Sequence, residues 1–342
     1  MRIGIPREIK DGEYRVALTP SAVAQLQGVV LEPGAGAGVG FSDAQYVEAG
    51  ATLGDAWSCE LIVKVKEVLP SEFGRARRGQ TICGFHQLSA EPEQLEAALA
   101  SGATYLVYHT VGQASGRYPV LAPMSAIAGR LAVQVGAWCL QRQNGGSGVL
   151  LPGVEGVPPG KVVIIGAGTV GANALAVAHA LGASVTVFAR SDRRFDALRE
   201  RFPDARYLSG LDAKALIDAD LVIGAVFLPG QRSPSLLSRA TLRSMRPGSA
   251  FVDVGIDQGG IAETSRQTTH SDPIYIAEGV VHYCVPNMPA ACARTASLAL
   301  SNAVLPYVQM LAKGRLDEDL RTGIQVSGGK VVHPTLAQST GR

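Results

Sequence analysis

A glycine-rich turn is the first stretch of this sequence whose residue types imply chemistry. Residues 162–171, VVIIGAGTVG, join an apolar strand to a helix-compatible segment, NALAVAHALG. In such a turn the first glycine allows a tight bend, the second lets a pyrophosphate approach the backbone, and the third lets helix and strand pack closely. A second apolar strand follows after about 20 residues, so we expect a dinucleotide site at the helix N-terminus rather than a purely structural turn. Its expected cofactor-binding residues are Gly166, Gly168, Thr169, Val170 and Gly171.

The end of the second strand indicates which dinucleotide is bound. In NAD sites a carboxylate at this point accepts hydrogen bonds from the ribose hydroxyls. The stretch VTVFARSDRR (185–194) has Ala189, Arg190 and Ser191 there instead, with Arg194 nearby. An alanine leaves room for a 2′-phosphate, an arginine can pair with it through two hydrogen bonds, and a serine adds a hydroxyl. We therefore expect NADP(H) as the preferred cofactor, with NAD(H) possible; the alternative is that Arg190 is only a solvated surface residue.

Strand-like and helix-like segments alternate through the first third of the chain. Short runs rich in β-branched or aromatic residues alternate with helical patterns, one of which ends at a glycine. Such alternation implies a parallel sheet. The expected strands are residues 2–6, 29–33, 61–66 and 104–109, and the expected helices are 20–26 and 91–102.

Two long helices are expected to bracket a second α/β unit. The first helix, 124–142, precedes a Gly/Pro-rich connector, and the last, 287–314, returns the chain to the first domain. The second unit begins at Lys161 and includes the strand-like segments 218–226 and 248–257. We therefore predict an α/β protein of two Rossmann-like domains with parallel sheets, a cleft between them and long linking helices. The predicted substrate domain is residues 1–120 plus 294–342, the predicted dinucleotide-binding domain is 121–293, and the tail 328–342 is expected to be partly disordered at its end.

Composition narrows the function classes. The 342 residues carry a net charge of +2 and are 46% hydrophobic, which is enough for two cores and gives no electrostatic reason to expect a nucleic acid or an anionic membrane as partner. Five scattered cysteines without a C-x-x-C pair argue against a disulfide framework or a metal site and suit a reducing cytoplasm. The charged N-terminus differs from a signal peptide, and glycines interrupt the uncharged stretch 162–189. We expect a cytoplasmic protein that acts on a small molecule and spans no membrane.

Seven segments, in order along nearly the whole chain, carry a resemblance to a known family. Together they resemble the alanine dehydrogenase family, which includes the nucleotide-binding subunit of proton-translocating transhydrogenase, and this chain is identified as a divergent, NADP-type member. The aspartate of GIDQGG favours the amino-acid dehydrogenases over transhydrogenase. The segments are MRIGIPREIKDGEYRVALTP (1–20), LIVKVKE (61–67), LAPMSAIAGRLAVQVGA (121–137), GKVVIIGAGTVGANA (160–174), GAVFLPG (224–230), VDVGIDQGG (252–260) and HYCVPNMPA (282–290).

The resemblance implies a role for individual residues. Arg15, in EYRVALTP, matches the arginine that grips the substrate carboxylate, and Lys66, in KVKE, matches the lysine that contacts the carboxylate and the keto or amino group. Asp257 matches a catalytic aspartate near the nicotinamide. The other implied cleft residues are Met124 on the substrate side, Ser125, Val226 and Met288 on the cofactor side, and Asn287, which contacts both ligands.

The chemistry of these residues suits a 2-oxo or 2-amino acid. A planar guanidinium binds a carboxylate, a lysine polarises a carbonyl, and a buried carboxylate exchanges protons as nitrogen adds or leaves. Each residue alone has a simpler interpretation: Arg15 as a surface arginine, Lys66 as a solvated strand-end lysine and Asp257 as a loop cap. Their joint occurrence favours the site.

One departure from the family pattern affects proton transfer. The family has a catalytic histidine in a motif of an aromatic residue, any residue, His, Leu, Ala and Ala. In GQTICGFHQLSA (79–90), Phe85 takes the aromatic position and is expected to touch the substrate, while Gln87 takes the histidine position and His86 lies one residue early. A shift of one residue turns a strand side chain to the opposite face, so His86 replaces the family histidine only if the backbone slips. Gln87 can hydrogen-bond a substrate but cannot transfer a proton at pH 7.

Two more departures remove carboxylates. The family's Tyr-Glu-Thr is Tyr108-His109-Thr110 here, and its Met-Ser-Glu ends in Ala126. His109 either supplies the proton chemistry that Gln87 lacks or is a hydrogen-bonded structural histidine. His179 and His282 are expected to be structural.

We expect an NADP(H)-dependent oxidoreductase that acts on the C–N bond of a small amino acid, its 2-oxo acid or a derived imine. NADPH suggests reduction, and reduction of a pre-formed imine needs only a hydride and one proton, which Lys66 or Asp257 could supply. The alternatives are a conventional NAD-dependent alanine dehydrogenase and a non-catalytic nucleotide-binding sensor. The family commonly forms homo-oligomers, and a dimer or a hexamer is expected.

Overall fold

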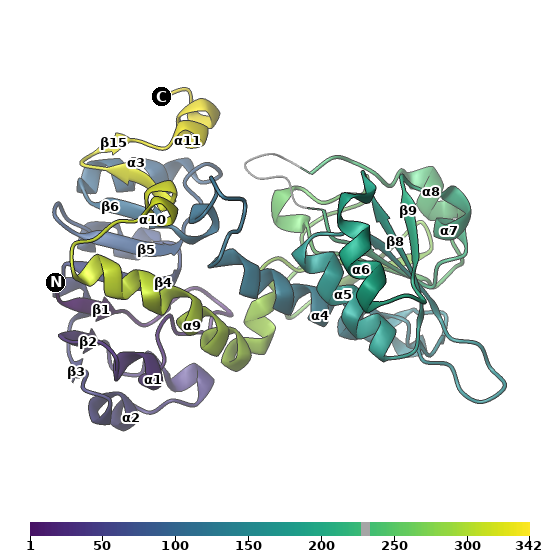
Figure 1. The fold of residues 1–342 in the computed structure, drawn as a ribbon, viewed down its shortest axis with the longest axis horizontal. Helices are drawn as coiled ribbons and strands as arrows, with labels where there is room; N and C mark the ends of the chain where they lie inside the picture. The colour runs from purple at the N-terminus through teal and green to yellow at the C-terminus, as the bar shows by residue number, and fades with distance from the viewer. Residues whose placement is uncertain (227–232) are drawn as a thin grey trace. The chain divides into compact units, whose positions relative to one another are not determined.

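The apolar strands of the sequence form two sheets in the computed structural model of the chain, which describes residues 1–226 and 233–342 (Figure 1). The chain divides into two compact units, residues 1–124 with 292–342 and residues 125–291. The predicted boundaries, 120/121 and 293/294, fall a few residues from these. Of the family-like segment 224–230, residues 227–230 lie outside the described residues.

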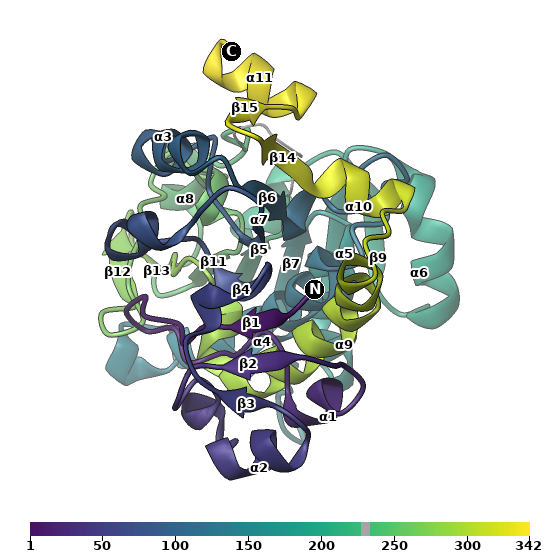
Figure 2. The ribbon, with the colours of Figure 1, turned by 90° about the vertical axis from the view of Figure 1, so that its left-hand side faces the viewer.

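The first unit is built on an eight-stranded sheet, whose strands follow one another in Figure 2 from β15 at the top to β3 near the bottom. Its order is β15-β14-β6-β5-β4-β1-β2-β3; the six strands from β6 to β3 pair in parallel, and β14 and β15 are antiparallel. The strands are β1 Ile3–Ile5, β2 Val29–Leu31, β3 Thr52–Leu53, β4 Leu61–Lys66, β5 Thr81–Phe85, β6 Thr104–Val107, β14 Ile324–Ser327 and β15 Lys330–Val331.

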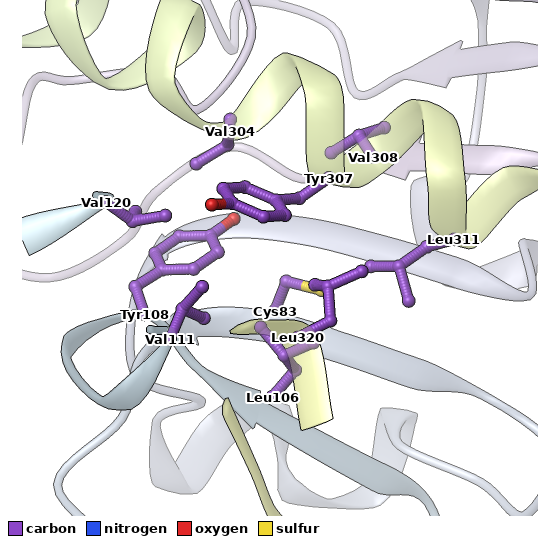
Figure 3. A pocket seen from close by; sticks show the side chains of 10 residues that line it. All are labelled: Cys83, Leu106, Tyr108, Val111, Val120, Val304, Tyr307, Val308, Leu311 and Leu320. Atoms are coloured by element: carbon purple, nitrogen blue, oxygen red, sulfur yellow. The ribbon is translucent and has the colours of Figure 1, made fainter. Parts of the chain in front are cut away.

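Helices cover both faces of this sheet because its strands are apolar on both sides. On one face Ile62, Ile82 and Tyr105 pack with Leu95 of helix α3 in a buried cluster. On the other, Cys83, Leu106 and Tyr108 meet Val304, Tyr307 and Val308 of helix α9 around a small apolar pocket (Figure 3). The helices of this unit are α1 Pro20–Val23, α2 Asp43–Glu48, α3 Pro92–Ser101, α9 Ala293–Ala312, α10 Glu318–Gly323 and α11 Pro334–Thr340.

The second unit has a seven-stranded sheet of order β12-β13-β11-β10-β7-β8-β9, in which only β12 among the named strands runs antiparallel. With β7 at the point where the strand order reverses, this is the doubly wound order of dinucleotide-binding domains. The strands are β7 Lys161–Ile165, β8 Ser184–Ala189, β9 Arg206–Ser209, β10 Leu221–Gly224, β11 Ala250–Asp253, β12 Ile274–Ala277 and β13 Val280–Tyr283.

The helices of the second unit are α5 Thr169–Ala180, α6 Phe195–Arg201, α7 Ala213–Ile217 and α8 Arg239–Ser244, and α4 Leu121–Cys139 contains the boundary between the units. Short 3₁₀ turns are η1 Ala37–Val39, η2 Ala56–Ser58, η3 Pro70–Arg75, η4 Tyr108–Thr110, η5 Arg142–Asn144, η6 Asp192–Arg194, η7 Ile256–Gln258 and η8 Met288–Cys292. No helix among the described residues is long and apolar enough to cross a membrane.

The predicted fold class, α/β with two Rossmann-like sheets, is confirmed, and three details differ. The antiparallel strands β12, β14 and β15 were not expected. The long helix α4 covers 121–139 instead of 124–142. The tail, expected to be partly disordered at its end, instead forms β15 and α11, because β14 pairs with β6 and Leu336 packs into the core cluster beside α3.

Candidate active site

Three predicted site segments meet at the edge of the first sheet that is formed by the carboxyl ends of its parallel strands. Lys66 ends β4 opposite Phe85, which ends β5, and Gly84 lies opposite Val107 at the end of β6. The rings of Phe85 and Tyr108 are in edge contact at 5.2 Å. Ligands of α/β sheets bind outside the carboxyl ends of parallel strands, so this edge is the natural place for a substrate.

Arg15 is buried, with 2% of its surface exposed, so the simpler interpretation as a surface arginine does not hold. The carboxylate of Glu13 accepts hydrogen bonds from Arg15 Nε at 2.7 Å, from Nη2 at 2.6 Å and from its main-chain N–H at 3.1 Å. Arg15 Nη1 lies 3.4 Å from the Sδ atom of Met124, another predicted site residue. This bidentate pair fixes the plane of the guanidinium.

Lys66 is likewise not a solvated strand-end lysine, since it is 7% exposed. Its Nζ atom lies 3.3 Å from the Glu67 carboxylate, which also pairs with Lys10. Burial opposes the charge of Glu67, but Lys66 and Lys10 outweigh it, so the pKa of Glu67 is lowered. The main-chain N–H of Val65, next to Lys66, donates to Glu8 Oε1 at 2.7 Å.

Behind Lys66 lies a buried ion-pair network centred on Lys64. Its Nζ atom is 2.9 Å from Glu72 and 3.5 Å from Glu8. Burial raises the pKa of Glu8 despite the nearby Lys64 charge. Because Glu8 binds both Lys64 and the Val65 N–H, it ties the loop after β1 to the end of β4.

The strand register separates His86 from its neighbours. Phe85 faces Tyr108, whereas His86 turns to the other face, where its ring meets Tyr105 at 5.1 Å. The His86 side chain has no exposed surface, neither ring nitrogen has a hydrogen-bond partner among residues 1–226 and 233–342, and burial lowers its pKa to about 3. Gln87 is partly exposed, and its main-chain N–H donates to Gln94 Oε1 at 2.8 Å.

His109 lies in η4, directly after β6, and is partly exposed. Burial within the protein lowers its pKa to about 4, and the charge of Lys66 and the imidazole of His333 act in the same direction. At pH 7 His109 is therefore neutral.

The glycine-rich turn of the second unit has the geometry that its sequence predicts. Gly166 has a positive φ of 118°, and a Cβ there would collide with the carbonyl oxygen of Ala225. A Cβ on Gly171 would collide with the Gly166 carbonyl, so only glycine allows this approach of helix α5 to the turn. Gly168 precedes α5, which begins at Thr169, and the nearest side-chain atom to a Cβ there would be Arg194 Nη1, at 3.5 Å.

Three arginines follow the end of β8 within five residues of the sequence. Arg190, Arg193 and Arg194 are exposed, and in the part of the chain that the structure describes no acidic side chain forms an ion pair with them. Ala189, the last residue of β8, stands where an acidic residue would face a ribose. Ser191 follows in extended conformation, and its hydroxyl caps no helix.

Asp257 lies in a loop that a buried carboxylate organises. Asp253, at the end of β11, accepts hydrogen bonds from the N–H groups of Gly255 and Ile261 at 3.2 and 2.8 Å and from the Ser265 hydroxyl at 2.6 Å. Asp257 is exposed within this loop, and its Oδ2 atom lies 3.5 Å from the main-chain nitrogen of Asn287. Asn287 has a φ of 55°, an unusual conformation for a non-glycine residue that often marks functional sites.

Comparisons with known proteins show the family of the chain. Residues 4–128 match the family described as alanine dehydrogenase/PNT, N-terminal domain, and residues 132–334 match the corresponding C-terminal domain. The chain belongs to this family. It is 46% identical to an alanine dehydrogenase of Halomonas elongata, over 100% of this chain and 97% of that protein, and 45% identical to one of Mycolicibacterium smegmatis, over 99% and 96%.

Solved structures of the family agree as well. A structure of L-alanine dehydrogenase matches with a TM-score of 0.96 and 44% identity, covering 100% of this chain and 99% of that one. A transhydrogenase from Sinorhizobium meliloti matches with a TM-score of 0.83 and 26% identity, covering 97% and 100%. The predicted enzyme class, a nicotinamide-dependent amino-acid dehydrogenase, is confirmed.

The structure adds residues of the family site that sequence reasoning missed. Glu13 stands in the quoted motif EYRVALTP, two residues before Arg15, and Asp253 stands in VDVGIDQGG, but a carboxylate's partner is visible only in the fold. His333 has no sequence signal, because an antiparallel strand in the tail places it. The remaining predicted residues, Ser125, Val226 and Met288, lie in the second unit. His282, expected to be structural, lies in β13 and hydrogen-bonds Thr264 and the Val280 carbonyl, while His179 packs against Phe202.

Proposed function

We propose that this family member is an NADPH-dependent reductase. Its substrate is a small 2-oxo acid or imine that bears a carboxylate, and its product is the corresponding amino acid, with a C–N single bond. Hydride passes from the nicotinamide to the α-carbon of the imine, and the imine nitrogen receives one proton; a 2-oxo acid must first add ammonia and lose water to give that imine. The compartment proposed is the cytoplasm, where five free cysteines stay reduced.

The observation that carries the cofactor preference is the exposed Arg190 beside Ala189. No carboxylate of the described chain neutralises its guanidinium, so it is available to a 2′-phosphate. A carboxylate at the Ala189 position would repel that phosphate. Arg193, Arg194 and the Ser191 hydroxyl add donors at the same strand end.

The substrate side is supported by the edge of the first sheet. Arg15, held flat by Glu13, presents a guanidinium suited to a carboxylate, and Lys66 stands at the end of β4 near the predicted carbonyl or imine. Phe85, Met124 and Asn287 complete the proposed contacts with the substrate.

The proton in this scheme comes from Lys66 or Asp257. Gln87 cannot transfer a proton, and His86 is enclosed in the core. His109 is neutral at pH 7, so it can act as a proton acceptor but not as an imidazolium donor. Oxidative deamination and its reverse, reductive amination of a 2-oxo acid, both need several proton transfers at the imine-forming or imine-hydrolysing step, so the missing family histidine favours reduction of a pre-formed imine.

A conventional alanine dehydrogenase is the second candidate, favoured by the name of the relatives that cover the whole chain. A non-catalytic nucleotide sensor is a third, which the buried, charge-paired Arg15 and Lys66 speak against, since a sensor has no need of them.

The proposal is tested by following NADPH and NADH oxidation with pyruvate plus ammonium and with a cyclic imino acid. We expect NADPH to give the higher kcat/KM and the imine to be reduced at least as well as pyruvate. Faster turnover of pyruvate with NADH would support the conventional enzyme, and no oxidation with any substrate would support the sensor.

Restoring the family histidine gives a second test. The Gln87→His variant is expected to gain NADP⁺-linked deamination of small amino acids, because an imidazole at this position can exchange protons, with a gain of about 10²-fold or more typical of general acid–base catalysis. The absence of any gain would show that residue 87 does not set the chemistry.

A further inference from the structure

The C-terminal hairpin brings a histidine to the sheet edge that carries His109. Strand β14 pairs with β6, and the chain returns along β14, so that the N–H groups of Val332 and His333 both donate to the Gln325 carbonyl, at 2.9 and 3.4 Å. The Gln325 amide donates to the Thr110 hydroxyl at 3.4 Å. Gln325 thus joins the segment of His333 to the segment of His109.

One ring nitrogen of His333 is buried without a partner in the described part of the chain. The residue is 8% exposed, and its Nδ1 atom has no hydrogen-bond partner within residues 1–226 and 233–342. Burial lowers its pKa, so it is neutral at pH 7. A buried polar nitrogen without a partner costs stability, and a ligand that supplies the missing hydrogen bond recovers that cost.

The surroundings of His109 include the charge of Lys66, which is itself paired with the Glu67 carboxylate at 3.3 Å. The groups that shift the pKa of His109 are Lys66 from β4 and His333 from the tail. His86, directly after β5, is neutral, and it and His109 interact electrostatically. Burial lowers the pKa of His86 more than the Glu67 carboxylate raises it. An anion placed here would meet two imidazoles and would share the charge of Lys66 with Glu67.

We propose that His109 and His333 form a subsite for a second anionic group of the substrate, a carboxylate on its side chain. This inference rests on the proposed function, in which Arg15 and Lys66 bind the other end of the molecule. Imidazole N–H groups donate to the carboxylate, whose charge also favours protonation of the rings. The substrate class is therefore 2-oxo dicarboxylic acids and the imines or amino acids derived from them.

The test compares 2-oxoglutarate with 2-oxopentanoate, which has the same five-carbon chain but no distal carboxylate. Binding of each acid is measured by calorimetry on the full-length wild type and on His109→Gln, His333→Gln and the control His179→Gln, which lies on α5 in the other unit. We expect the wild type and the control to bind 2-oxoglutarate at least about tenfold more tightly, because hydrogen bonds to a charged group typically contribute this much. In the two site variants we expect 2-oxoglutarate to weaken about tenfold and 2-oxopentanoate to change less than about twofold.

A second readout does not depend on affinity for either acid. The Cε1–H resonances of the chain's six histidines are followed by NMR from pH 3 to 8 with saturating 2-oxoglutarate and without it. We expect the pKa of His109 to rise with the dicarboxylate and to stay unchanged with 2-oxopentanoate. Equal binding of the two acids, with no change in the His109 titration, would overturn the subsite. Turnover of 2-oxopentanoate would then still leave the proposed function standing.

Discussion

At the scale of single residues, the direction in which each side chain leaves its strand decides its chemistry. Phe85 and His86 are neighbours in sequence, yet one meets Tyr108 and the other meets Tyr105 on the opposite face. This alternation could be predicted from the period of two in a strand. It leaves His86 as a neutral histidine in an apolar core, with consequences for stability rather than for substrate binding.

We predict that His86 makes the protein acid-sensitive. Its pKa is about 3 in the folded chain and about 6.5 when unfolded, so its contribution to stability is complete above pH 6.5 and is lost as the pH falls toward 3. The loss is about 1.4 kcal/mol per pH unit in that window. The melting temperature of His86→Leu should therefore fall less between pH 7 and pH 5 than that of the wild type or of His179→Gln. Parallel curves for all three proteins would refute this.

The second residue-scale prediction concerns Glu13. In Glu13→Gln the buried Arg15 loses the carboxylate that pairs with its Nε and Nη2 atoms; breaking a buried ion pair on one side typically costs about 3–5 kcal/mol, and the loss frees the guanidinium from its plane. We expect a lower melting temperature and a KM for the 2-oxo acid raised more than about tenfold, with NADPH affinity within about twofold of the wild type. The exposed Glu60→Gln is the matched control. An unchanged KM in a folded Glu13→Gln protein would contradict the positioning role.

At the scale of elements, the loop from β11 to Ile261 depends on Asp253. In Asp253→Asn the amide NH2 would replace Oδ1 and face the Gly255 N–H, or replace Oδ2 and face the Ile261 N–H and the Ser265 hydroxyl, so at least one of three hydrogen bonds is lost. We expect kcat to fall about tenfold or more because Asp257 is displaced, while NADPH still binds. Steady-state kinetics and NADPH titration measure the two effects, and Asp204→Asn, at an exposed position outside the proposed cofactor site, is the control. A normal kcat in a variant that binds NADPH would exclude this role.

The elements divide into those that local pattern could predict and those that it could not. The strands β4, β7 and β8 and the helices α3 and α9 follow from apolar runs, glycine positions and length. The strands β14 and β15 are short and polar, and they exist because β6 offers them an edge to pair with. That pairing is what places His333, so the histidine pair could not be predicted from sequence.

At the scale of the whole molecule, the candidate site draws on segments far apart in the sequence. The residue types at positions 15, 66 and 190 could be recognised because each follows a motif with a known purpose. Glu13 and Glu67, which pair with Arg15 and Lys66, and Asp253, which organises the loop of Asp257, could not be recognised, since an ion pair or a loop hydrogen bond depends on how the chain returns. Each unit contributes one half of the proposed chemistry, a carboxylate-binding edge in the first and a dinucleotide turn in the second.

The central claim, a preference for NADPH set by the end of β8, is tested most directly by fluorescence titration with NADPH and NADH. The proteins are the wild type, Arg190→Ala and the control Arg315→Ala, an exposed arginine of the first unit. We predict tighter binding of NADPH by the wild type and the control. In Arg190→Ala we predict a loss of about tenfold or more for NADPH and little change for NADH, since only NADPH carries the phosphate. Equal or tighter binding of NADH by the wild type, unchanged in Arg190→Ala, would contradict the claim and return the NAD-dependent alanine dehydrogenase to first place.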